Sequence, residues 1–162
     1  MGACVREPII AIFAASPALA SVLSMVVAGD PKLRVRVFDS AVSLRAYMRI
    51  APISVLVCDC DREDVDMPAF VMSLREDPDA AERRFSSIAL SRQVSRSFKR
   101  QIDASGIDEV LVKPMSPRHL LERVHARLAR RSRSPSSPRP RHRPLEWGPN
   151  VVELFPGGQP AL

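Results

Sequence analysis

Five short segments rich in apolar residues recur along the chain, and each is followed by a longer segment with helical periodicity. Most of these short segments are almost continuously apolar, which is typical of strands buried on both faces of a parallel sheet. The alternation predicts a doubly wound α/β domain, a five-stranded parallel sheet with helices on both faces. The five expected strands are residues 9–13, 34–38, 53–58, 87–90 and 109–112.

Serine followed by proline marks the start of two of the expected helices. Ser16-Pro17 and Ser116-Pro117 each combine an N-cap residue with a proline at the first helical position. Apolar residues at helical spacing then predict the side of each helix that faces the sheet. The residues expected on these inner sides include Leu19, Val22, Leu23, Val26, Val42, Leu44, Tyr47, Met48, Phe70, Val71, Leu74, Leu120, Leu121, Val124 and Leu128.

The composition changes abruptly near Arg130. With 162 residues and 46% hydrophobic residues, the chain is long enough for one core and a tail. We expect a domain over residues 8–130 and a tail over residues 131–162. The run RRSRSPSSPRPRHRP cannot bury apolar surface and predicts disorder. Residues 145–156 regain apolar side chains, and either a docking peptide or a segment that folds back on the domain fits them.

The net charge of +6 belongs to residues 123–162, the end of the last helix and the tail, because residues 1–122 carry equal numbers of basic and acidic side chains. An anionic partner and a merely solvated tail both explain this asymmetry. The candidate anion-binding side chains are Arg130, Arg131, Arg133, Arg139, Arg141 and Arg143.

The cysteine and histidine residues predict neither a disulfide framework nor a zinc site. There are three cysteines, and Cys58 and Cys60 fit best as small buried side chains. His119 and His125 lie six positions apart, which does not place them together on one helix face. With no signal peptide and no apolar run of the ~18 residues that span a bilayer, we expect a soluble cytoplasmic protein.

Function in a doubly wound domain gathers at the carboxyl ends of the strands. Ala14, Ala15, Asp59, Ser91 and Lys113 occupy these positions. The segments that contain them make the chain resemble the receiver domain of bacterial response regulators, the CheY-like family, over about residues 8–130. The matching segments are IAIFAASP (10–17), VLVCD (55–59), IALS (88–91) and GIDEVLVKP (106–114), of which the last is closest to the family pattern.

The resemblance implies a phosphoacceptor at Asp59, with Ser91 and Lys113 contacting the phosphoryl group. In the family an acidic pair at the positions of Ala14 and Ala15 helps to hold Mg²⁺, an ion that prefers oxygen ligands. Alanine offers no such ligand, so a phosphoryl group at Asp59 would meet uncompensated negative charge. We therefore expect a pseudo-receiver without normal magnesium-dependent phosphorylation, in which Asp59 pairs with Lys113.

Two further positions depart from the family pattern. Val110 stands where the family has an aromatic switch residue, and Arg62-Glu63 replace a Met-Pro pair. The loop also contains Asp61 and Asp64. These carboxylates could act with Glu63 as substitute metal ligands for a working phosphoacceptor, but we expect a solvated acidic loop.

The leading hypothesis is a stand-alone, non-enzymatic regulator in bacterial two-component signalling or a phosphorelay, without a cofactor. It would bind a signalling protein through the face around the fourth strand, fourth helix and fifth strand. The main alternative uses the Arg-rich tail, as in receiver-like proteins that bind cyclic di-GMP through such tails. Nonspecific nucleic-acid binding, with Trp147 as a stacking surface, would use the same arginines.

Overall fold

The computed structural model describes residues 7–133 and 146–147. Strands and helices alternate in the order that the sequence predicts, and all five predicted strands are present. The elements are β1 (Ile9–Phe13), α1 (Pro17–Ala28), β2 (Arg34–Phe38), α2 (Ala41–Ile50), β3 (Val55–Asp59), α3 (Met67–Glu76), β4 (Ser86–Ser91), α4 (Arg96–Ser105), β5 (Glu109–Val112), α5 (Pro117–Arg133) and β6 (Glu146–Trp147).

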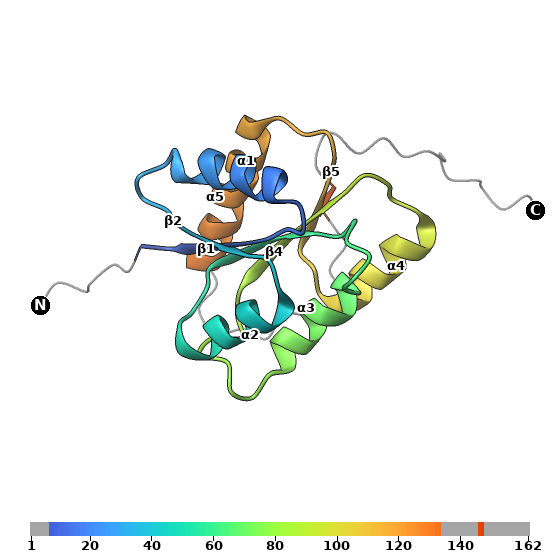
Figure 1. Ribbon diagram of the computed structural model, residues 1–162, viewed down its shortest axis with the longest axis horizontal. Helices are drawn as coiled ribbons and strands as arrows, with labels where there is room; N and C mark the ends of the chain where they lie inside the picture. The colour runs from blue at the N-terminus through green and yellow to red at the C-terminus, as the bar shows by residue number, and fades with distance from the viewer. Residues whose placement is uncertain (1–6, 134–145, 148–162) are drawn as a thin grey trace, which may run out of the picture.

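All strands are parallel, and their order in the sheet is β2-β1-β3-β4-β5-β6. Helices α1 and α5 cover one face of the sheet, and α2, α3 and α4 cover the other (Figure 1). The chain moves outward from β1 to β2, then returns to place β3 on the other side of β1. This reversal opens the carboxyl edge of the sheet beside β1 and β3, where ligands bind in doubly wound folds.

The core has two parts, one on each face of the sheet. Aliphatic side chains fill the part under α1 and α5, with Ile10, Ile12 and Leu90 fully buried. The other part adds aromatic rings, and the rings of Phe13 and Phe70 lie 5.5 Å apart, between their centroids. Both faces of the central strands are therefore apolar, as their continuous apolar sequence predicts.

Side-chain caps fix where the helices begin. Ser16 Oγ accepts a hydrogen bond from the amide of Leu19 at 3.3 Å, and Ser116 Oγ accepts one from the amide of His119 at 3.1 Å. Both serines were predicted as caps from the Ser-Pro signal. These caps end the loops that follow β1 and β5, which are two of the loops at the carboxyl edge.

The structure corrects several details of the sequence prediction. Val42 and Val22 were expected to face the sheet, but they are 79% and 49% exposed. The side of each helix that contacts the core is narrower than the spacing of its apolar residues suggested. Helix α5 continues to Arg133, three residues past the expected domain boundary. For residues 145–156 a docking peptide and a segment that folds back on the domain were both expected alternatives, and residues 146–147 form a sixth strand of the sheet, as the second alternative predicts. The rest of that tail prediction concerns residues 134–145 and 148–162, outside the described part.

No helix within the described residues is both long and apolar enough to cross a bilayer.

Candidate functional site

Three of the predicted site residues meet at the carboxyl edge of the sheet. Asp59 ends β3 and Ser91 ends β4, while Lys113 directly follows β5. These three strands are neighbours and end nearly level, since Asp59 pairs with Leu90. Asp59 and Ser91 are 7% and 4% exposed, so the site is largely withdrawn from water.

The Lys113 ammonium lies at the centre of this cluster. Its Nζ donates to Asp59 Oδ1 at 2.8 Å and lies 2.6 Å from Asp61 Oδ2. The predicted pairing of Asp59 with Lys113 is therefore confirmed, and a second carboxylate joins it. Charge-assisted hydrogen bonds of this kind are roughly twice as strong as neutral ones.

Asp61 belongs to the site, so the expectation that it lies in a solvated acidic loop is wrong. Its carboxylate accepts hydrogen bonds from Ser91 Oγ at 3.1 Å and from the Arg92 amide at 3.0 and 3.1 Å. Its own amide donates to Asp59 Oδ1 at 3.1 Å, an Asx turn that directs the chain back over the strand ends. The sequence signal for this turn is Asp59 itself, because an aspartate side chain readily accepts a hydrogen bond from the backbone amide two residues later.

The remaining acidic residues of the loop behave as predicted. Glu63 and Asp64 are exposed, and Asp64 pairs with Arg62 rather than with the central cluster. They add no carboxylate to the network around Lys113.

The protonation states follow from these contacts. Burial opposes ionisation of Asp61, but hydrogen bonds from Lys113, the Arg92 amide and Ser91 outweigh it and hold the pKa of Asp61 below its ordinary value. Burial likewise opposes the charge on Lys113, and its contacts with Asp59 and Asp61 raise the pKa of the ammonium above its ordinary value. The contacts therefore favour the charged forms of Asp61 and Lys113.

The end of β1 contributes no polar side chain to the site. Ala14 is buried and Ala15 is exposed. The guanidinium of Arg62 lies over the ring of Phe13, the last residue of β1, with its carbon 4.3 Å from the ring centroid. The side chain of Arg62 is only 4% exposed, and its buried Nη1 has no hydrogen-bond partner in the structure.

Arg62 was predicted only as a departure from the family pattern. In the structure its cationic side chain packs against Phe13, the residue directly before Ala14 and Ala15. A cation over an aromatic face is an attractive arrangement. The basic character of this side of the site was not apparent from the sequence.

The residues present do not fit the Mg²⁺ that the resemblance implies. Mg²⁺ binds through several oxygen ligands in near-octahedral geometry. Ala14 and Ala15 supply no side-chain oxygen, and both nearby carboxylates already contact the Lys113 ammonium. In residues 7–133 and 146–147, no three acidic, histidine or cysteine side chains are grouped to hold a metal ion.

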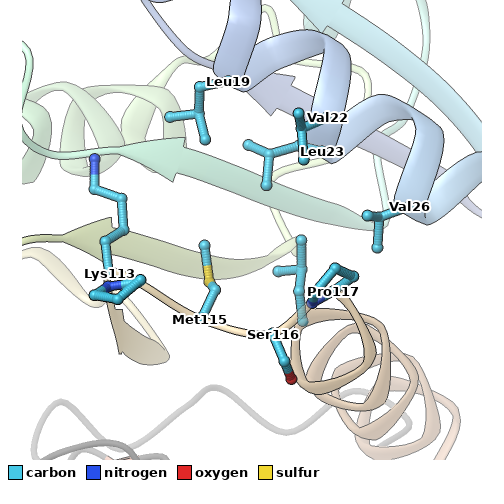
Figure 2. Close-up of a pocket in the computed structure, with 10 residues that line it drawn as sticks. Leu19, Val22, Leu23, Val26, Lys113, Met115, Ser116 and Pro117 are labelled. Atoms are coloured by element: carbon cyan, nitrogen blue, oxygen red, sulfur yellow. The ribbon is translucent and has the colours of Figure 1, made fainter.

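An apolar groove of about 190 Å³ adjoins the site between α1 and the start of α5. Leu19, Leu23 and Val26 of α1 face Met115 across it, and Lys113 lies at one end (Figure 2). The Lys113–Pro114 peptide bond beside it is cis. Apart from Lys113 and Ser116 the lining is apolar, and it contains no acid–base or nucleophile pair, so the groove suits packing rather than chemistry.

The two described cysteines are buried or half-buried, as predicted. A hydrogen bond with Cys58, together with burial, raises the pKa of the Cys60 thiol well above its ordinary range. The thiolate is the reactive form of cysteine, so this environment disfavours reactivity at Cys60.

Three of the six candidate anion-binding arginines lie within the described residues. Arg130, Arg131 and Arg133 lie in the last turn of α5, where Arg131 Nη2 lies 3.8 Å from Glu82 Oε2. Arg139, Arg141 and Arg143 lie outside the described residues. The cyclic di-GMP and nucleic-acid hypotheses therefore still rest on the sequence alone.

No family model and no curated protein matches the sequence. The structure, in contrast, matches many solved receiver structures. The chemotaxis response regulator CheY4 of Vibrio cholerae superposes with a TM-score of 0.66 at 20% identity, covering 75% of this chain and 99% of that chain. The receiver domain of the Francisella response regulator 1452 gives 0.66 at 20% identity, covering 76% and 98%.

A CheY-like response regulator receiver domain protein from Methanospirillum hungatei gives a TM-score of 0.69 at 16% identity, covering 78% of this chain and 97% of that chain. These matches span nearly the whole length of the solved receivers. The chain therefore has the receiver fold, as its sequence resemblance predicted, and about a quarter of it lies outside the match.

Proposed function

We propose that this protein is a regulator that works by binding a protein partner in signal transduction, not by catalysis or by magnesium-dependent phosphorylation of Asp59. One observation carries the proposal. The Lys113 ammonium is shared by two carboxylates, while the end of β1 offers alanines where a metal-binding acidic pair is expected. A lysine thus supplies the positive charge of the site from within the chain.

The electrostatics of the cluster oppose phosphorylation. A phosphoryl group on Asp59 would lie beside the Asp61 carboxylate. Lys113 would have to neutralise both, helped only by the 78% exposed side chain of Arg92, whose Nε lies 3.7 Å from Asp61 Oδ2. Like charges at such separations in a partly buried site repel by several kcal/mol. The Ser91 hydroxyl, which the family uses to meet the phosphoryl group, already donates to Asp61 Oδ1. The arrangement is consistent with a site held in one state by internal contacts.

In this proposal the cluster joins three loops and fixes the shape of the adjoining surface. Lys113, Asp59 and Asp61 connect the loop after β5 to the loop after β3, and the Arg92 amide adds the loop after β4. The expected partner-binding face around β4, α4 and β5 begins at these same loops. A rigid preformed face loses less entropy on binding than a mobile one.

The charges on this face favour an acidic partner. Arg92 precedes α4, and Arg96 and Arg100 lie on α4 with exposed side chains. Asp103 is the acidic residue of α4, so the helix carries a net positive charge. Complementary charges steer association and raise its rate.

Phosphorylation itself can be tested directly. The protein is incubated with acetyl phosphate and Mg²⁺, and its intact mass is measured against an Asp59→Asn control. We expect no phosphorylated species in either protein. A phosphorylated species that forms on the wild-type chain and disappears in Asp59→Asn would overturn the proposal.

A further inference from the structure

Strand β6 places a segment of the chain's own tail against β5. Glu146 pairs with Glu109, and Trp147 pairs with Val110, in parallel register. Without β6, β5 would be the edge of the sheet, with a row of backbone groups free to accept another strand. The tail segment therefore covers a position where a sheet can be extended.

The β5 strand presents a well-ordered template for such pairing. Glu109 and Val110 are fully buried, and Glu109 is paired with Arg123 and with Arg127 Nε at 2.7 Å. These ion pairs fix β5 against α5. Its pairing with β4 continues to Ser91, at the edge that carries the Lys113 cluster.

Within the part of the chain that the structure describes, β6 pairs with only part of β5. Two residues of β5 are in register with β6, and within the described residues Leu111 and Val112 have no partner strand on that side. A two-residue strand forms few ladder hydrogen bonds, so the β5–β6 pairing is only weakly stable on its own. Segments with so few contacts belong to the least stable parts of a fold and open first.

Tethering compensates for this weakness. Residues 134–145 join α5 to β6 within one chain, so β6 does not have to find β5 by diffusion as a separate molecule would. A segment that binds only weakly on its own can therefore occupy β5 most of the time. An external strand must then displace it, which lowers the apparent affinity of that strand for β5.

We propose that Glu146–Trp147 is a displaceable intramolecular cover that occludes β5 against strand addition. When the cover is released, β5 accepts an extended peptide segment in the same register. Because β5 lies on the face assigned above to partner binding, the cover also controls access to part of that face. The inference itself does not depend on the identity of a partner.

The cover is tested in the full-length chain with a proline variant. Trp147→Pro removes a backbone donor within β6 and cannot sustain the strand. Val151→Pro, outside β6, is the matched control, and far-UV circular dichroism checks that both fold. Should Trp147→Pro fail to fold, Glu146→Pro replaces it. We expect faster hydrogen exchange at the β5 amides in the β6 variant and wild-type exchange in the control.

A second measurement tests occlusion. A fluorescent peptide with the sequence of residues 143–150 is titrated against the wild-type and variant chains, and anisotropy is recorded. We expect at least about tenfold tighter binding to Trp147→Pro than to wild type, because the tethered competitor is gone. Unchanged β5 exchange in the variant, equal peptide binding to both chains, or binding to neither would each overturn the inference. No partner protein is used, so this test can fail while the proposed function stands.

Discussion

Replacing Lys113 with methionine tests whether one ammonium holds the site together. The substitution keeps the length of the aliphatic stem but removes the charge between Asp59 and Asp61. Both carboxylates contact Nζ, at 2.8 and 2.6 Å, so their contacting oxygens lie within hydrogen-bonding reach of a single point. Their side chains are 9% and 22% exposed, so water can screen them only partly.

The magnitude follows from this geometry. Two unit charges ~5 Å apart at an effective dielectric constant of ~20 repel by roughly 3 kcal/mol. Removing one partner of a buried ion pair typically lowers the free energy of unfolding by about 3–5 kcal/mol, because the remaining charge stays buried without a countercharge. The partial exposure of Asp61 reduces this, so we expect Lys113→Met to lower the free energy of unfolding by about 3 kcal/mol at pH 7.

Urea unfolding followed by circular dichroism measures this loss. Adding Asp59→Asn to Lys113→Met removes one of the two repelling charges and should recover roughly 1–2 kcal/mol. Magnesium should not recover it, because the end of β1 supplies no ligand. A loss below about 1 kcal/mol, or no recovery in the double variant, would show that the Lys113 ammonium does not stabilise the two carboxylates as described.

Three further predictions concern stability. Arg75 donates hydrogen bonds to the carbonyls of Phe85 and Gly106, so Arg75→Met leaves these acceptors without their donor and should lower the free energy of unfolding in urea by about 3 kcal/mol. A loss under about 1 kcal/mol would contradict a structural role for Arg75. Arg127→Ala leaves the fully buried Glu109 with a weaker countercharge, and we expect a loss of about 2–3 kcal/mol in thermal unfolding. Because the folded pKa of Asp61 lies below its unfolded value of ~3.9, its stabilisation is present above that pH and disappears as pH falls through the folded pKa. The acid limb of a stability–pH curve should therefore flatten in Asp61→Asn, and an unchanged limb would contradict the pKa shift.

The fold could be predicted from the sequence because local signals agreed with one another. The apolar run of β3 is continuous, Ser16-Pro17 marks the start of α1, and Ser116-Pro117 marks the start of α5. Such agreement between strand pattern and helix caps specifies an alternating α/β order. The Asp59–Lys113 contact also followed, because the carboxyl ends of parallel strands meet at one edge.

The role of Asp61 could not be predicted because acidic loop residues usually face water. Its place depends on the turn that Asp59 forms with the Asp61 amide and on Ser91 from another strand. Those are contacts between segments that are distant in sequence. The burial of Arg62 over Phe13 depends in the same way on how the loop after β3 folds across β1.

Strand β6 was not predicted as a strand, although folding back on the domain was one of the two alternatives for residues 145–156. Two residues carry too little pattern to identify a strand, and Glu146-Trp147 lies beyond a low-complexity segment. Only the exposed edge of β5 in the assembled sheet gives this segment a partner. The exposure of Val42 similarly depends on how α2 lies against its neighbours, which periodicity alone does not specify.

In the proposed function an internal ammonium, not a divalent metal ion, neutralises the carboxylates at the carboxyl edge. Titrating Mg²⁺ into isotopically labelled protein and following the backbone amide resonances of Asp59, Cys60 and Asp61 tests this most directly. We predict no saturable change at these amides up to millimolar metal. Saturable shifts that vanish in Asp59→Asn would contradict the account.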